Sequence, residues 1–501
     1  METKLGRIKI PLLEVREVGY VKDVKHGIAK VDGLPSCVYG QLVEFPQHNT
    51  RGMVIGFNPH EVLVIILGKE SNISVGDSVS SLAELLSVPV GEGYLGRIVN
   101  SLGEHIDGKG NILAVSDYFP VFREAAGVME REPVTEPLLT GIKIIDLVVS
   151  IGKGQRELII GDRQTGKSGI GIDTIINQKN KDVVCIYCWI GGAQTALKKI
   201  LYTLQQKNAF EYTIVVSSSA DTSAAEQYLA PYTACTLGEY FMFNGKDVLV
   251  IFDDLTKHAW IYREMSLLLE RSPGREAYPG DIFYLHSQIM ERAGKLKKEL
   301  GGGSMTFLPI CETLQGDITG YIQSNLVSMT DGQIYISTPL FHEGFKPAID
   351  LGLSVSRIGS RVQCPAIKEV SGELRLEYAQ YREMLRLTKL RTHLSSEALE
   401  KMRRGETLRE LFIQPNNQPL SLAEEIVLFY AFRRKILEVL PQPTLRRFIN
   451  EFFGYCSTYH PQLLKELSEK QELTQEIRAE LDKTLIEFFK KIKAEEKPPE
   501  Q

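Results

Sequence analysis

The sequence predicts a multidomain protein with an N-terminal β-barrel or sandwich, a central α/β domain and a C-terminal α-helical bundle. Residues 14–85 contain short β-branched runs separated by glycine and turn residues, a pattern typical of a small all-β domain. After residue 155, apolar strand-like runs alternate with helical stretches, which favours a mostly parallel, doubly wound sheet. After residue 371, charged amphipathic helical patterns dominate. The predicted domain limits are 1–85, 86–370 and 371–501.

The last predicted helix carries an apolar stripe at helical spacing. Its members are Ile477, Leu481, Leu485, Phe488 and Ile492. Such a stripe is most simply one face of the core of a helical bundle.

The composition of the 501 residues is that of an ordinary globular protein, with 43% hydrophobic and 24% charged residues. A formal net charge of -5 provides no overall attraction for nucleic acid, so nucleic acid is not an expected partner. The chain starts without the features of a signal peptide, and it contains no uninterrupted apolar run of about 18 residues. We therefore expect any membrane association to come through partner subunits.

The seven cysteines are odd in number and scattered, which favours reduced thiols over a disulfide framework. Only Cys185 and Cys188 form a CxxC pair, and they lie in the strand-like run VVCIYCWI. Residues three apart on a strand point to opposite faces. We therefore expect two buried small side chains and no shared metal.

The segment GDRQTGKS, residues 161–168, fits the phosphate-binding pattern GxxxxGK[ST]. It follows the strand-like run RELII and precedes a helical pattern, as that loop requires. Gly161 and Gly166 let backbone N–H groups surround phosphate oxygens, and Lys167 can reach the outer phosphates. The hydroxyl of Ser168 can bind magnesium. The sequence therefore predicts a nucleotide site for ATP or ADP with Mg²⁺.

Two acids follow the buried strand-like run VLVIF. In phosphate-loop NTPases such a strand brings an aspartate toward magnesium, and Asp253, the first acid, is the better candidate. We expect Asp254 to cap the helix that follows.

Hydrolysis also requires a residue that aligns or deprotonates the attacking water. In related ATPases it is often a carboxylate at the end of a neighbouring strand. Here VVCIYCWI continues into Gly191, Gly192, Ala193 and Gln194, none of which is an acid. The sequence therefore predicts a site that holds ATP better than it splits it.

Four segments together carry a family resemblance: GQRELIIGDRQTGKS, the long stretch from IFDDLTKHAW through PGREAYPGD, ETLQGDITGYIQSN and GLSVSRIGS. The chain resembles the alpha subunits of F-type rotary ATP synthases, from about residue 14 into the helical region. The resemblance implies a β-barrel, a RecA-like phosphate-loop domain and a helical bundle. It also implies three alpha and three beta subunits alternating around a gamma shaft, with nucleotides at the interfaces.

The resemblance implies roles for individual residues. Arg357, which on its own is most simply a solvated or salt-bridging arginine, corresponds to the finger that reaches the neighbouring beta subunit. Ser354 corresponds to a position required for activity. Ser168 and Asp253 would hold the magnesium, directly or through water. The noncatalytic nucleotide site is assigned to Gly161, Asp162, Arg163, Gln164, Thr165, Gly166, Lys167, Ser168 and Gln414.

The chain departs from the family pattern around the nucleotide. IGGAQT stands for the usual IGQKRS, so Gly192 and Ala193 replace an amide and a base, and we expect a looser pocket there. GFKP stands for GIRP, and IQPNNQP for KQGQYSP, which keeps Gln414 but puts Asn416 at a glutamine position. Lys346 cannot reproduce the planar fork of arginine, so the family's base contacts do not carry over to this position.

The N-terminal segment is about a dozen residues long where the family has a longer helix that binds the delta subunit. Either the stator contact is made differently, or the chain belongs to a divergent branch of the family, an N-type or second-operon copy that could be sodium-linked.

The expected function is therefore that of a regulatory, noncatalytic alpha subunit. It would couple a proton or sodium gradient to ATP synthesis or hydrolysis, with no turnover by the isolated chain. The expected partners are beta, gamma and the stator subunits of delta and b type, and the expected location is the cytoplasmic face of the bacterial plasma membrane. Two alternatives stay open: a self-sufficient hexameric motor, such as an RNA translocase or secretion ATPase, and a scaffold that no longer binds nucleotide.

Overall fold

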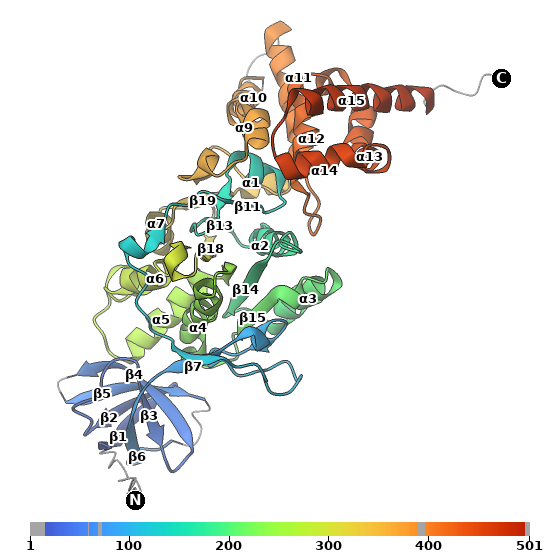
Figure 1. Cartoon of the computed structure of the whole chain (residues 1–501). Helices are drawn as coiled ribbons and strands as arrows, with labels where there is room; N and C mark the ends of the chain where they lie inside the picture. Colours follow the sequence, from blue (N-terminus) through green and yellow to red (C-terminus); the bar gives the residue numbers. More distant parts are fainter. Residues whose placement is uncertain (1–15, 59, 69–72, 389–395, 496–501) are drawn as a thin grey trace, which may run out of the picture.

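The computed structural model describes residues 16–58, 60–68, 73–388 and 396–495. Three parts follow one another along the chain: a β-barrel, an α/β domain and a group of helices (Figure 1). The barrel and the helical part lie at opposite ends of the α/β domain (Figure 1). No described helix is both long enough and apolar enough to cross a membrane.

Six strands close into the N-terminal barrel, which decides between the barrel and the sandwich. Neighbouring strands are antiparallel, and the barrel interior is filled by valine, isoleucine and phenylalanine side chains. In order around the barrel they are β1 (Val18–Lys25), β2 (Ile28–Asp32), β5 (Glu61–Leu67), β4 (Thr50–Asn58), β3 (Gln41–Phe45) and β6 (Ser78–Leu85).

The central domain is built on a ten-stranded, mostly parallel sheet, as the alternating pattern predicts. Its main path runs through β20 (Val355–Ser356), β19 (Gly332–Ile336), β13 (Leu158–Asp162), β18 (Ser304–Thr313), β16 (Asp247–Asp253), β14 (Val183–Ile190), β15 (Thr213–Ser218) and β8 (Ile98–Val99). The edge strand β20 is antiparallel to β19, whereas the strands from β19 to β8 are parallel to their neighbours on this path.

Helices cover both faces of this sheet and form two separate apolar cores. One face packs against α1 (Lys143–Val148), α2 (Lys167–Ile176) and α3 (Gln194–Gln206). The other packs against α4 (Ala224–Phe243), α5 (Leu255–Leu268), α6 (Ile282–Met290) and α7 (Tyr321–Met329). Cys185 belongs to the first core and Cys188 to the second, so the prediction that they point to opposite faces is confirmed. All seven cysteines are free thiols.

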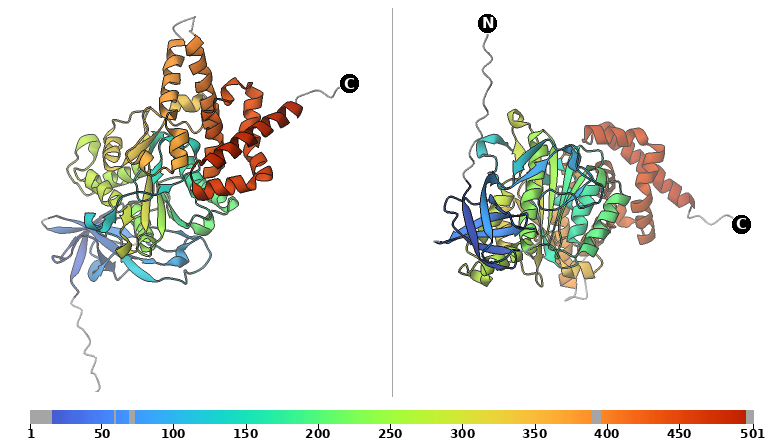
Figure 2. Two further views of the ribbon diagram at one scale, coloured as in Figure 1. Left: turned by 45° about the horizontal axis from the view of Figure 1, so that its top comes forward. Right: turned by 90° about the horizontal axis from the view of Figure 1, so that it is seen from below.

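The C-terminal part is helical, as predicted. It comprises α9 (Pro365–Ser371), α10 (Leu374–Thr388), α11 (Ser396–Phe412), α12 (Leu422–Arg433), α13 (Gln442–Tyr459), α14 (Pro461–Lys470) and α15 (Gln475–Glu495). All five members of the predicted apolar stripe on α15 are buried. The core of these helices is continuous with the core beneath α1 to α3, so the bundle is joined to that face of the sheet (Figure 2).

The strand β6 ends at Leu85 and the helix α9 ends at Ser371. These positions lie near the domain limits placed from the sequence, which remain predictions. The short N-terminal segment, on which the stator contact was predicted to depend, lies outside the described residues.

Candidate nucleotide site

The phosphate loop connects the end of β13 to the start of α2. The backbone is left-handed at Gly166 (φ 101°) and at Gln164 (φ 61°), so the chain turns sharply before the helix begins at Lys167. Gly161 allows close approach to β19, because a Cβ there would lie 2.6 Å from the carbonyl oxygen of Ile336. The N–H groups of the first helical turn remain available for an anion.

Lys167 is folded back over this loop. Its side chain is buried, and Nζ donates to the carbonyl oxygens of Gly161 at 2.9 Å and Asp162 at 2.6 Å. Burial lowers the pKa of Lys167, while the neighbouring acids Glu312 and Asp254 oppose that shift. An outer phosphate at the loop would supply the negative charge that a buried ammonium group requires.

Asp162, which was predicted to bind nucleotide, anchors the loop from behind. Its carboxylate accepts hydrogen bonds from Thr313 Oγ1 at 2.6 Å, Thr338 Oγ1 at 2.6 Å and the Gly316 N–H at 2.8 Å. Its own carbonyl oxygen accepts a bond from Thr165 Oγ1 at 2.7 Å. These bonds use the polar groups of both side chains to hold the shape of the loop.

Arg163 pairs with an acid near the end of β18. Its Nε donates to Glu312 Oε2 at 2.8 Å, and its guanidinium lies 5.7 Å from the ring centre of Trp260. Arg163 therefore neutralises an acid beside the loop.

The candidate magnesium ligands, Ser168 and Asp253, lie in the first turn of α2 and at the end of β16. The carboxylate of Asp253 is buried and accepts a 2.5 Å hydrogen bond from the hydroxyl of Tyr187, which is also a partner of the Ser168 side chain. Mg²⁺ usually combines one or two protein oxygens with phosphate oxygens and water. The hydroxyl and carboxylate fit that set. Among the described residues there is no cluster of three or more histidine, cysteine or acidic side chains that could hold a metal by itself.

Asp254 caps α5, as predicted. Its Oδ1 accepts the N–H of Lys257 at 2.8 Å, and its Oδ2 lies 3.4 Å from Lys257 Nζ. Burial raises the pKa of Asp254 to about 6.

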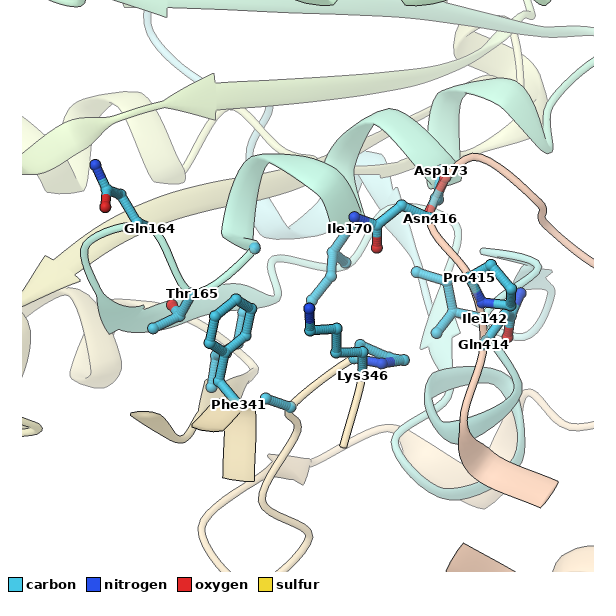
Figure 3. A pocket seen from close by; sticks show the side chains of 14 residues that line it. Ile142, Gln164, Thr165, Ile170, Asp173, Phe341, Lys346, Gln414, Pro415 and Asn416 are labelled. Atoms are coloured by element: carbon cyan, nitrogen blue, oxygen red, sulfur yellow. The ribbon is translucent and has the colours of Figure 1, made fainter. Parts of the chain in front are cut away.

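A cavity of about 200 Å³ opens beside the loop (Figure 3). Gln164 and Thr165 lie at one end of it, and Asp173 and Asn416 lie at the other (Figure 3). Its walls come from the residue before α1, the loop, α2, the end of β19, α8 (Thr338–His342) and the segments after α8 and α11. They are Ile142, Gln164, Thr165, Gly166, Ile170, Asp173, Ile336, Phe341, Lys346, Pro347, Ala348, Gln414, Pro415 and Asn416. Such a cavity next to the phosphate loop is suited to the base and ribose of a nucleotide.

Gln414 lines this cavity but uses its amide to join segments of the protein. Its Nε2 donates to the carbonyl oxygens of Gly141 at 2.7 Å and Gln418 at 2.9 Å. Its Oε1 accepts the N–H of Lys143 at 3.1 Å. Since both amide hydrogens are taken, Gln414 forms a rigid wall and offers a bound base at most an acceptor.

Lys346 lies on the facing wall, with Nζ 4.7 Å from the ring centre of Phe341 (Figure 3). The ammonium is a single mobile charge, whereas the arginine usual in the family is a flat group that can stack on a base. Phe341 supplies the flat apolar surface here.

Gly192 does not leave the loose space that was expected. A Cβ at this position would lie 2.5 Å from Cε2 and 2.8 Å from Cη2 of Trp189, and closer still to Cζ2. The indole therefore fills the space beside the turn, and the expectation of a looser pocket is wrong at this position.

Arg357 lies near the amino ends of the parallel strands, whereas the phosphate loop lies at their carboxyl ends. Arg357 directly follows β20. This strand pairs with the first residues of β19, and those residues in turn lie beside the start of β13. The loop follows the end of β13, and the five residues of that strand span roughly 16 Å. The Arg357 side chain is exposed. The backbone of Arg357 is therefore separated from the phosphate loop of its own chain by about the length of β13.

Ser354 is buried and supports this edge. Its Oγ accepts the N–H of Tyr335 at 2.9 Å, and its carbonyl oxygen accepts a bond from Arg375 Nη2 at 3.0 Å. Ser354 therefore holds the backbone just before Arg357.

Comparison with known proteins places the chain in a family. Sequence models of the ATP synthase alpha/beta family match its beta-barrel domain at residues 14–83, its nucleotide-binding domain at 141–356 and its C-terminal domain at 363–488. "ATP synthase subunit alpha" of Clostridium botulinum strain Hall is 48% identical over 476 residues, which are 95% of this chain and 94% of the relative. "ATP synthase subunit alpha" of Clostridium acetobutylicum is 48% identical over 484 residues, 97% and 95% of the two chains. The chain belongs to the ATP synthase alpha subunit family.

Sequence reasoning missed several residues beside the candidate site, notably Tyr187, Trp189, Asp173 and Phe341. Tyr187 and Trp189 are two positions apart on β14, so both side chains lie on the face of the sheet that carries α2 and α3. That spacing was a usable signal, because the parallel strand β14 brings its last residues to the same end of the sheet as the phosphate loop. No local signal marks Asp173, whose carboxylate accepts the N–H of Asn417 from the distant C-terminal part at 2.7 Å.

Proposed function

We propose that this chain is the noncatalytic, nucleotide-binding alpha subunit of a membrane-attached rotary ATP synthase. It binds ATP or ADP with Mg²⁺ at its own phosphate loop and supplies Arg357 to the catalytic site of an adjacent beta subunit. The complete assembly couples a proton or sodium gradient to ATP synthesis or hydrolysis. The isolated chain is catalytically inactive.

One observation carries the noncatalytic assignment. The loop, Lys167, Ser168 and Asp253 are suited to phosphate and magnesium, but β14, which pairs with the strand that ends at Asp253, is followed by Gly191 and Gly192 instead of an acid. A phosphate site without a residue that activates water holds nucleotide without splitting it efficiently.

The other acids near the loop are already engaged. Asp253 accepts a hydrogen bond from Tyr187, Asp254 is paired with Lys257, and Glu312 is paired with Arg163. A carboxylate held in this way is a poor base for water. This supports nucleotide retention.

The position of Arg357 supports its role in a neighbouring subunit. It is exposed and lies near the amino ends of the parallel strands, away from its own loop. An arginine in this position cannot stabilise a transition state in its own site, whereas an adjacent chain can present its phosphates to it. Arginine fingers contribute about 1,000- to 100,000-fold in rate. Ser354, buried behind this segment, positions the finger.

The proposed partners are alternating beta subunits, the gamma shaft and stator subunits of delta and b type. The chain would lie at the cytoplasmic face of the bacterial plasma membrane as a peripheral subunit. Attachment would come through these partners and the membrane sector.

MgATP binding by the purified chain tests the nucleotide site. We expect saturable binding with negligible turnover, and a large loss of affinity in Lys167→Ala, because the ammonium group no longer faces the phosphates. Equal, weak binding by both proteins would favour a scaffold. Rapid hydrolysis by the purified chain would favour a self-sufficient motor, and salt-sensitive RNA binding would point to a translocase.

Reconstitution with beta and gamma subunits tests Arg357. Arg357→Ala should leave MgATP binding by this chain intact and lower steady-state ATP hydrolysis of the complex by about 1,000-fold or more. Arg361→Ala is the matched control, since Arg361 is exposed in the same segment. Normal turnover of the Arg357→Ala complex would contradict the finger assignment.

A further inference from the structure

Trp189 lies near the end of β14 with only 5% of its surface exposed. Its indole stacks on Tyr187 with ring centres 6.4 Å apart, and Lys257 Nζ lies 5.5 Å from its ring centre. Among the described residues, Nε1 of this buried indole has no hydrogen-bond partner. A buried donor without a partner is rare and costly, and therefore calls for an explanation.

Trp189 and Gly192 form a matched pair. The edge of the six-membered ring next to Nε1 faces the turn at Gly192, where any Cβ would clash with Cζ2, Cε2 and Cη2 of the indole. A larger side chain at 192 is therefore incompatible with Trp189 in this position. The indole occupies the space into which a side chain at the end of β14 would extend.

That space adjoins the groups that face the outer phosphates. In the sheet register Trp189 lies opposite Asp253, the candidate magnesium ligand. Tyr187, on which the indole stacks, donates to the carboxylate of Asp253, and Lys257, above the ring, is paired with Asp254. These residues lie at the carboxyl ends of the parallel strands, the same edge of the sheet as the phosphate loop.

We propose that Trp189 is a nucleotide-contacting residue of this site. Its Nε1–H donates to an oxygen of the outer phosphate and magnesium unit, and its ring takes the place of a side chain at position 192. The inference rests on the proposed nucleotide binding and adds a residue that recognises the outermost phosphate. Because Nε1 is enclosed, the contact requires the ring to shift, and the shift changes the surroundings of the indole.

Tryptophan fluorescence reports this contact directly. The chain has two tryptophans, Trp189 and Trp260, and Trp260 also lies near the loop through Arg163. A Trp260→Phe protein therefore isolates the signal of Trp189. Titration with MgATP should change its emission along the same curve as binding measured by equilibrium dialysis. MgADP should change it less, because the outermost phosphate is missing.

Trp189→Phe tests the N–H itself. Phenylalanine keeps an aromatic ring against Tyr187 but has no donor, so affinity for MgATP should fall about 5- to 10-fold. Affinity for MgADP should change little. Trp260→Phe is the matched control and should bind both nucleotides as the wild type does. A cooperative urea unfolding transition would show that Trp189→Phe is folded.

The outcomes separate the two proposals. Tight MgATP binding by the wild type, with unchanged affinity in Trp189→Phe and flat emission from Trp189, would overturn the inference and leave the nucleotide site standing. Equal losses of MgATP and MgADP affinity in Trp189→Phe would also overturn it, since they indicate general damage to the pocket. Equal, weak binding by the wild type and Lys167→Ala would refute the proposed function and this inference together.

Discussion

Replacing Gly192 by alanine should destabilise the central domain, although such a change is often stabilising elsewhere. The new Cβ would lie 2.5 Å from Cε2 and 2.8 Å from Cη2 of Trp189, whereas carbon atoms in contact are about 3.5 to 4.0 Å apart. The indole is rigid and buried, so the ring or the turn must move. Overpacking of this kind costs about 1 to 3 kcal/mol.

The same substitution should have the opposite effect on the free energy of unfolding once the indole is removed. The backbone at Gly192 does not adopt the left-handed conformation that favours glycine. In a Trp189→Ala protein, Gly192→Ala should therefore stabilise by about 0.4 to 1 kcal/mol, because it restricts the unfolded chain. The coupling between the two positions should then be about 1.4 to 4 kcal/mol.

Urea unfolding of the four proteins, followed by circular dichroism, measures this coupling. The four proteins are the wild type, both single variants and the double variant. Trp189→Ala alone should cost about 3 to 5 kcal/mol, since it removes a large buried side chain. A coupling energy near zero would refute the argument that Trp189 excludes a side chain at position 192.

Two further predictions concern buried polar groups. Both carboxylate oxygens of Glu425 on α12 lack a hydrogen-bond partner within the described part of the chain, and burial raises the pKa of this acid well above its ordinary value. A buried acid whose pKa is raised by folding destabilises the folded protein as the pH rises from the unfolded pKa, about 4.3, through the folded pKa. Glu425→Met should therefore stabilise the protein by about 1 to 3 kcal/mol at pH 8, and by less at pH 5, in urea titrations. An equal gain at both pH values would contradict this assignment. Ser354→Ala leaves the N–H of Tyr335 without its acceptor and should cost about 1 to 3 kcal/mol. In a reconstituted complex it should lower turnover while nucleotide binding by this chain stays normal, and an unaltered rate would remove its positioning role.

The periodicity of the sequence was enough to predict the order and type of the domains. Successive side chains of a strand point to opposite faces, and this rule correctly placed Cys185 and Cys188 of VVCIYCWI on opposite faces of the sheet. The phosphate loop and the cap at Asp254 were also predictable. Both depend on short-range backbone geometry that a few adjacent residues specify.

Contacts between distant segments could not be predicted from local patterns and became visible only in the packed structure. The amide of Gln414 is used by Gly141, Gln418 and Lys143, which no local pattern reveals. The position of Arg357 near the amino ends of the parallel strands depends on β20 pairing with β19, a register between separate strands. The space beside Gly192 was expected to be loose and is filled by Trp189, because the orientation of an indole depends on all the surfaces around it. Local rules therefore located the phosphate loop, and three-dimensional packing determined which neighbouring groups remain free to act on a nucleotide.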